Sequence, residues 1–174
     1  MNNHTINNNF VPNFQRFINL VDFLSEKQGK NVTQIVYIEQ LRLLPIGTFG
    51  RAWADFLDSN NLQPFTNGLR RKQLHDGVHI LTGYNADAIG EAELQAFLLG
   101  AKFIPIHILI ILGLLKPISQ QLSEQTSKNL QQSIYKRLWQ AYQRGRNSHF
   151  DPDKWQPELL WKLPLEQVQV LYKL

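Results

Sequence analysis

Four residues near the middle of the chain have the types and the spacing expected of metal ligands: His75, Asp76, His79 and Glu91. The two histidines lie four positions apart with Asp76 between them, so at about 100° per residue all three fall within about a third of one helix's circumference. Imidazole nitrogen and carboxylate oxygen together suit Zn²⁺, Fe²⁺ or Mn²⁺, and the two carboxylates would also accept Mg²⁺. The pattern therefore predicts a divalent metal site and leaves the identity of the metal open.

Ordinary helix surfaces show the same spacing, so other interpretations stand beside the metal site. His75 would then decorate a solvated face, and Asp76 would balance the basic run at residues 70–72. Asp76 and Glu91 could also act as bases instead of ligands. A phosphohydrolase of the HD class is disfavoured because it needs an upstream histidine and only His4 precedes the motif. A zinc protease is disfavoured because it needs glutamate where Asp76 stands.

The segments that must position these residues have apolar residues at helical spacing. Apolar stripes at helical spacing predict helices over 12–28, 31–44, 48–57, 68–82, 87–99 and 118–144, with further helix starts at Pro152 and Pro164. No pair of alternating strands, no repeat and no linker is found. The sequence therefore predicts an all-α fold, a single-domain helical bundle of about seven to nine helices over residues 12–174, behind a disordered tail at residues 1–11.

A predicted helical hairpin brings Glu91 to the histidines. Residues 83–85 read Gly-Tyr-Asn and form a turn between the two helices that carry the motif. An antiparallel return over so short a connection would bring the Glu91 carboxylate near His75. Gly90 beside it allows the helices to approach closely.

Composition narrows the function further. The chain has 174 residues, 43% of them hydrophobic, which is enough for one globular domain. Cysteine is absent, which excludes disulfides, iron–sulfur clusters and thiol nucleophiles and leaves any metal to His, Asp and Glu. A net charge of +4 favours acidic lipids or anionic ligands and is too small to indicate a nucleic-acid partner. Residues 1–9 resemble neither a signal peptide nor a transit peptide.

The run His75-Asp76-Gly77-Val78-His79, followed by eleven residues and Glu91, matches the signature HDxxHx11E. On this motif the chain resembles the coenzyme Q (ubiquinone) biosynthesis family formed by the fourth of the Coq proteins. Other segments are similar to the same family: Pro45–Phe56 with its GxxGRxxxxF pattern, Leu81–Gly83, Ile89–Glu91, Gln143–Arg146 and Pro164–Val168. The resemblance extends from about Gln34 to the end of the chain.

The resemblance implies that His75, Asp76, His79 and Glu91 bind a divalent metal ion, with zinc first and magnesium, manganese or iron as alternatives. It also implies an all-helical fold, peripheral association with a membrane and a role in modifying the quinone ring. That role is either catalysis of the oxidative C1 decarboxylation of a polyprenyl hydroxybenzoate, a lyase activity, or that of a non-catalytic lipid-binding scaffold for the biosynthetic complex.

The chain departs from the family pattern at two places. Gly77 stands where many relatives carry a bulky apolar residue, and the C-terminus lacks the usual Arg-containing ending. Eukaryotic members carry mitochondrial targeting, which the N-terminal residues here do not resemble. We therefore expect a location in the bacterial cytoplasm, peripheral to the cytoplasmic membrane.

The most hydrophobic segment, Phe103–Leu115, is too short for a membrane span, which needs about 20 apolar residues. It is apolar nearly all round, which favours a ligand, a partner subunit or a membrane over its outer face, with core packing as the alternative. His107 within it is expected to be a hydrogen-bonded buried imidazole and not a ligand. The expected prenyl groove is lined by Phe103, Ile104, Ile108, Ile111 and Leu112.

These features predict the partners of the chain. A prenylated quinone precursor or another isoprenoid lipid would place its ring at the metal site, with Arg70, Arg71 or Lys72 attracting an anionic head group. A solvated basic helix start is the alternative for at least two of these cations. The membrane surface, other quinone biosynthesis proteins and a second copy in a homodimer are the further expected partners.

Overall fold

The computed structural model describes residues 31–121 and 127–174 of the chain. Within these residues it contains eight α-helices, a short 3₁₀ helix at Pro157–Leu159 and no β-strand, which confirms the all-α fold class. The predicted tail at residues 1–11 and the predicted helix over residues 12–28 lie outside the described residues.

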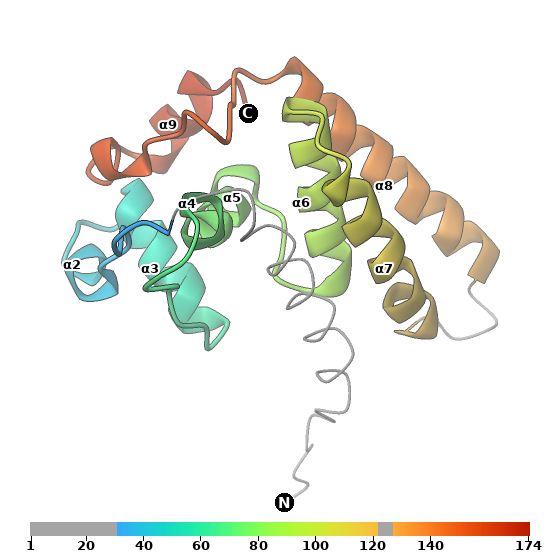
Figure 1. The fold of residues 1–174 in the computed structure, drawn as a ribbon, viewed down its shortest axis with the longest axis horizontal. Coiled ribbons are helices and arrows are strands. Elements are labelled where there is room, and N and C mark those ends of the chain that lie inside the picture. Colours follow the sequence, from blue (N-terminus) through green and yellow to red (C-terminus); the bar gives the residue numbers. More distant parts are fainter. Residues whose placement is uncertain (1–30, 122–126) are drawn as a thin grey trace, which may run out of the picture.

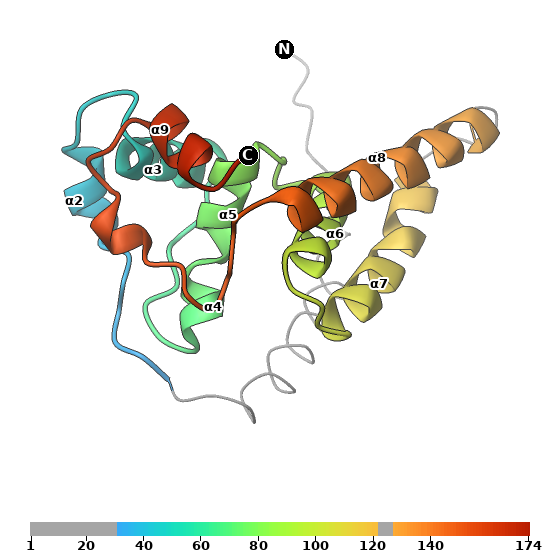
Figure 2. The same ribbon diagram turned by 90° about the horizontal axis from the view of Figure 1, so that it is seen from above.

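The helices form two groups that meet at the α5–α6 connection (Figure 1). The first group consists of α2 (Ile38–Arg42), α3 (Phe49–Ser59), α4 (Arg70–Gln73), α5 (His75–Thr82) and α9 (Leu165–Leu171). The second group consists of α6 (Ala88–Ala101), α7 (Ile106–Gln121) and α8 (Ser127–Asn147). Figure 2 shows α6 between the first group and the α7–α8 pair, and α6 packs against both α7 and α8.

Local sequence signals explain where several helices begin and end. The Thr48 hydroxyl accepts a hydrogen bond from the Arg51 backbone N–H and caps α3, close to the start of the helix predicted over residues 48–57. Arg51 also pairs with Asp55 one turn later at 2.7 Å. Gly83 ends α5 in the left-handed conformation, at φ 75°, which glycine adopts without steric cost. Pro164 precedes α9, so the predicted helix start there is confirmed.

The helix predicted over residues 31–44 is wrong in its first half, because α2 begins only at Ile38. Residues 31–37 are not helical, and their backbone groups bond to a distant side chain. The Gln73 side chain accepts from the Ile35 N–H at 2.9 Å and donates to the Val32 carbonyl at 3.1 Å. This side chain is buried at the end of α4, so it replaces the hydrogen bonds that a helix would have supplied.

The single helix predicted over residues 118–144 is also wrong. Residues 118–121 belong to the end of α7, and α8 starts at Ser127 and runs to Asn147. The predicted end at residue 144 is wrong as well, because Gly145 lies inside α8, where a Cβ atom would be 2.0 Å from the Phe97 carbonyl oxygen. Glycine is required here for the close crossing of α6 and α8. The helix start predicted at Pro152 is wrong too, since residues 152–154 form a turn.

A cluster of aromatic rings fixes α5 against α3. Trp53 of α3 and Trp155 stack with their ring centroids 6.1 Å apart and their planes at 9°. Gly77 of α5 faces these rings, because a Cβ atom there would lie 2.2 Å from a Trp53 ring carbon and 2.7 Å from one of Trp155. The two rings therefore fill the volume that a bulky side chain at position 77 would need, which gives the departure from the family pattern a physical reason.

Candidate metal centre

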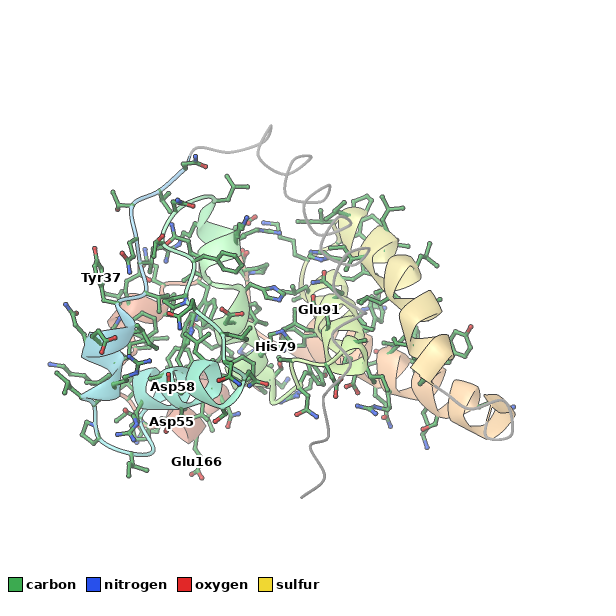
Figure 3. The ribbon with its side chains drawn as sticks, turned by 90° about the horizontal axis from the view of Figure 1, so that it is seen from below. Tyr37, Asp55, Asp58, His79, Glu91 and Glu166 are labelled. Carbon is green, nitrogen blue, oxygen red and sulfur yellow. The ribbon has the colours of Figure 1, made fainter. Side chains whose placement is uncertain are left out.

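Three of the four candidate ligands, His75, His79 and Glu91, lie next to one another because of where two helices start. His75 is the first residue of α5, and His79 lies one turn further along. The Asp87 carboxylate accepts a hydrogen bond from the Gly90 N–H at 2.7 Å and caps α6, so that Glu91 lies in its first turn. Figure 3 shows His79 and Glu91 between the two groups of helices.

The turn between α5 and α6 folds tightly because of Gly90. A Cβ atom at this position would lie 2.1 Å from the Asn85 carbonyl oxygen. Any other residue at position 90 would push the turn and α6 apart. Glu91, which follows on α6, would then move away from the histidines. The sequence analysis expected Gly90 to allow the two helices to approach closely; the contact that requires glycine is instead between α6 and Asn85 of the turn.

One carboxylate oxygen faces both imidazoles. Nε2 of His75 and Nε2 of His79 each lie 3.1 Å from Oε2 of Glu91. The two rings are 5.1 Å apart and nearly perpendicular, at 80°. One ligand atom from each of the three residues lies within 4.8 Å of the other two. The arrangement can hold one metal ion with two nitrogen ligands and one oxygen ligand.

Both ring nitrogens of His79 face oxygen atoms. Nδ1 lies 3.0 Å from the Tyr84 backbone carbonyl, and Nε2 faces Glu91. Because a carbonyl only accepts, Nδ1 carries the proton, and in the neutral ring the Nε2 lone pair points at a carboxylate. A second proton on the ring or a cation between Nε2 and Oε2 makes this contact attractive. A carbonyl that orients the second ring nitrogen is typical of metal-binding histidines.

Burial and charge act in opposite directions on the two acidic groups. Burial tends to raise the pKa of Glu91, but the charges and hydrogen bonds of His75 and His79 hold that pKa well below its ordinary value. Burial raises the pKa of Asp76. Asp76 is buried, lies outside the three-residue group, and has no hydrogen bond to its carboxylate among the described residues.

The site is buried on one side and accessible on the other. The His79 side chain is 3% exposed and stacks on the Phe56 ring with the centroids 5.5 Å apart, whereas the His75 side chain is 30% exposed. A pocket of about 390 Å³ adjoins His79 and is lined also by Phe56, Ile80, Tyr84 and Asn85. His75 is therefore the more solvent-accessible of the two histidines.

Sequence reasoning missed Gln95, which binds the second oxygen of Glu91. Nε2 of Gln95 donates to Oε1 of Glu91 at 2.6 Å, and Oε1 of Gln95 accepts from Nδ1 of His107 at 2.6 Å. The signal that could have found Gln95 is its position four residues after Glu91 on the same helix. The prediction that His107 is a hydrogen-bonded buried imidazole is confirmed.

The three candidate head-group cations are already engaged. Arg70 donates to Glu158 and to the Trp155 carbonyl, each at 2.8 Å, and Arg71 pairs with Asp153 at 2.5 Å. These bonds hold the segment after α8 against α4. Lys72 lies 5.1 Å from the Phe65 ring centre. The structure therefore gives Arg70 and Arg71 a role in tying two segments together.

The candidate prenyl residues lie along one apolar helix and the loop before it. Phe103 is 71% exposed, Leu112 is 56% exposed and Ile108 is 37% exposed. Ile104 and Ile111 are half-buried. α7 thus presents an apolar outer face, while no described helix combines the length and the apolar character needed to cross a membrane.

The fold and the site together define a class: an all-helical protein in which two imidazoles and a carboxylate converge between two groups of helices. The family model described as "Coenzyme Q (ubiquinone) biosynthesis protein Coq4" matches residues 22–150. Because this match covers most of the chain, the chain belongs to the Coq4 family. The resemblance based on the motif is confirmed.

Individual relatives agree with this assignment. The "Ubiquinone biosynthesis protein COQ4 homolog, mitochondrial" of Xenopus tropicalis is 29% identical over 129 residues, which cover 58% of this chain and 46% of the frog protein. The homologue of the same description from Bos taurus is 31% identical over 84 residues, which cover 40% of this chain and 32% of the bovine protein. The aligned part of the chain thus spans less than half the length of these curated relatives.

A solved structure has a similar fold. The crystal structure of a "Putative ubiquinone biosynthesis protein" from Nostoc punctiforme PCC 73102 superposes with a TM-score of 0.64 at 17% identity. The match covers 90% of this chain and 79% of the cyanobacterial chain. At this level of identity the likeness supports the fold alone.

Proposed function

We propose that this protein acts in coenzyme Q biosynthesis on a polyprenylated hydroxybenzoate, with a divalent metal held by His75, His79 and Glu91. Zinc is the first candidate, and magnesium, manganese and iron are the alternatives. When bound, the metal would act as a Lewis acid toward the carboxylate or the ring oxygens of the substrate. The proposed reaction is oxidative decarboxylation at C1 of the ring: the bond from C1 to the carboxylate breaks, a C1–OH bond forms, and O₂ takes up the two electrons (ArCO₂H + O₂ + H₂O → ArOH + CO₂ + H₂O₂).

The position of His79 is the single observation that carries the metal proposal. Its two nitrogens lie 3.0 Å and 3.1 Å from oxygen acceptors, and the ring is buried. A divalent cation would turn the unfavourable approach of a lone pair and a carboxylate into two ligand bonds. His75 offers a second nitrogen to the same oxygen, so the donor set fits a metal ion.

Asp76 is the candidate for either a fourth ligand or a proton acceptor. Burial raises the pKa of the Asp76 carboxyl, and the charges of His75, His79 and Glu91 also act on it, so this group lies within electrostatic reach of the candidate ligands. D76N distinguishes the two roles. Loss of the metal would assign Asp76 as a ligand, whereas retained metal with lost turnover would assign it as a base.

The exposed apolar face of α7 supports a long hydrocarbon ligand. The outer face of α7, formed with the preceding loop by Phe103, Ile108 and Leu112, is exposed, and a helix of this length could contact several prenyl units. Contact of the same face with the cytoplasmic membrane of a bacterium would bring the protein to a lipid substrate, and a second copy could cover it in a homodimer. Arg70 and Arg71 are unsuited as head-group ligands unless their ion pairs open.

Metal analysis and complementation test the proposed function. Purified wild-type protein is expected to contain close to one equivalent of divalent metal and to yield a prenylated compound on lipid extraction. H79A should lose the metal and fail to restore quinone levels in a strain that lacks the endogenous homologue. H149A is the matched control, because His149 is exposed beyond the end of α8. Wild-type protein without metal or lipid, or an H79A chain that restores quinone normally, would refute the proposal.

A second candidate function is a non-catalytic scaffold that presents the prenylated lipid to other quinone biosynthesis proteins. The exposed apolar face of α7 favours it, because such a face could bind a lipid or a partner without any chemistry. Single-turnover assays with a prenylated hydroxybenzoate, metal and oxygen separate the two. A catalyst releases carbon dioxide and a hydroxylated ring, and a scaffold forms no product.

A further inference from the structure

We infer that Gln95 and His107 are positioning residues that fix the orientation of the Glu91 carboxylate for metal binding. This inference rests on the proposed metal site and adds to it two residues outside the ligand motif. The three side chains form one continuous chain of hydrogen bonds from α7 through α6 to the candidate ligands.

The direction of every hydrogen bond in this chain follows from Glu91. An ionised carboxylate only accepts, so the Gln95 amide must present its NH₂ group to Oε1 of Glu91, at 2.6 Å. The amide oxygen then faces His107, at 2.6 Å from Nδ1, and Nδ1 must carry a proton. Each group has one role, and reversing any of them would break a bond.

The consequence for the metal site is that the two Glu91 oxygens are distinguished. Oε1 is held by Gln95, and Oε2 faces both His75 and His79. Without the bond from Gln95, the carboxylate could rotate about its last torsion and present either oxygen or both. A neighbour that orients a metal-binding carboxylate typically changes metal affinity by 10- to 100-fold.

The burial of His107 indicates that its bond to Gln95 matters. The residue is 6% exposed, and its second nitrogen, Nε2, is buried without a hydrogen-bond partner among the described residues. Burial lowers the pKa of His107 to about 4, so the ring stays neutral and keeps its proton on Nδ1. A leucine would fill the same space without leaving a nitrogen unpaired.

A purely structural role is the competing explanation, since the same bonds also join α7 to α6. Asparagine and leucine at position 107 separate the two explanations, because the positioning role requires the hydrogen-bond donor for metal binding. The side-chain NH₂ of asparagine reaches the position of Nδ1 in histidine and preserves the donor, whereas leucine preserves the volume and removes the donor. A metal-binding readout at equal folding therefore separates them.

The experiment titrates chelator-treated full-length protein with Zn²⁺, by competition with a chromophoric chelator, and with Co²⁺, by its visible absorption. Q95M and H107L are expected to weaken Zn²⁺ binding by about 10- to 100-fold and to alter the Co²⁺ spectrum, while H107N stays within about threefold of wild type. The matched controls are Q140L and H149L, at exposed positions on and after α8. Circular dichroism checks that each variant is folded.

Each outcome bears on a different claim. Folded Q95M and H107L chains with wild-type affinity and spectrum would overturn the inference, as would an H107N chain that loses as much affinity as H107L. If H107L does not fold, H107Q replaces it with the same expected loss, because its longer side chain places the donor away from the Nδ1 position. A wild-type chain that binds no metal would overturn the proposed function as well, whereas a metal-binding wild type with unaffected variants overturns only the role of Gln95 and His107.

Discussion

At the scale of single residues, the site is defined by the contrast between His75 and His79. His79 is enclosed by Phe56 and the Tyr84 carbonyl, so its orientation is fixed before any metal binds. The His75 side chain is 30% exposed, so this side of the group is open to solvent. A zinc ion held by these three residues alone would keep an open position, as catalytic zinc sites do and structural sites do not.

Replacing one carboxylate oxygen tests the ligand assignment. E91Q removes the negative charge that faces both imidazoles, and we expect it to weaken Zn²⁺ binding by about 100-fold or more. E93Q is the matched control on the same helix, because Glu93 is also buried but pairs with Arg137 at 2.6 Å. The dissociation constants come from the chelator competition assay. Equal affinities for E91Q and E93Q would contradict the assignment.

The neutral state of His107 predicts a pH dependence of stability. Burial lowers its pKa from 6.5 to about 4, so between these pH values the unfolded chain takes up a proton that the folded chain does not. Above pH 6.5 the His107 ring does not lower the free energy of unfolding. As the pH drops from 6.5 toward 4, its protonation in the unfolded chain lowers that free energy by up to about 3 kcal/mol.

Urea unfolding with a chelator present, across this pH window, checks the prediction. H107N should lack this part of the pH dependence. As the pH falls, the free energy of unfolding of the wild type should therefore decrease more than that of H107N. The other titrating groups are common to both chains and cancel in the comparison. Parallel curves for the two proteins would show that His107 does not titrate as proposed.

At the scale of elements, the α5–α6 hairpin depends on how closely α5 can approach α3. Gly77 sits where a Cβ atom would lie 2.2 Å from Trp53, and that ring is itself stacked on Trp155. A methyl group there must move one of the rings or the helix that carries both histidines.

We therefore expect G77A to lower the free energy of unfolding by about 1–3 kcal/mol, through overpacking of this contact. Thermal unfolding followed by circular dichroism provides the measurement. G113A serves as the control, since Gly113 lies exposed within α7 and alanine there should be neutral or slightly stabilising. A wild-type melting temperature for G77A would mean that the rings accommodate the methyl group freely.

How far the sequence predicts these elements depends on whether the signal is local. The Thr48 cap, the Gly83 turn and the convergence of His75, His79 and Glu91 follow from neighbouring residues and were predictable. The extended segment at residues 31–37 was not, because its partner, Gln73, lies about forty positions away in sequence. The end of α8 was predicted too early, at residue 144, because the glycine that follows could equally mark a helix stop or, as here, a close helix crossing.

At the scale of the whole molecule, the candidate centre lies where the two groups of helices meet, as Figure 3 shows for His79 and Glu91. In the second group α7 lies on the other side of α6 from the first group (Figure 1), and Leu109 and Leu112 of α7 are exposed. The candidate ligands on α5 and α6 and the exposed apolar residues of α7 thus lie on helices that pack one against the next, α5 on α6 and α6 on α7.

Charge on the α7 face tests its role in membrane or lipid contact. L112E is expected to reduce binding to vesicles of phosphatidylcholine and phosphatidylglycerol by about tenfold or more, because a carboxylate resists entering an apolar phase. L159E is the matched control on the 3₁₀ helix, where Leu159 is 73% exposed in the first group. Sedimentation with vesicles gives the bound fraction. Equal effects of the two substitutions would rule out a specific role for α7.

The central claim is that His75, His79 and Glu91 bind one divalent metal ion together. Crystals of the zinc-loaded protein, with data collected on both sides of the zinc absorption edge, test it most directly. We predict a single anomalous peak about 2.0–2.2 Å from Nε2 of each histidine and from a Glu91 oxygen. A peak elsewhere, or none at this site while Glu91 still contacts the imidazoles directly, would contradict the account.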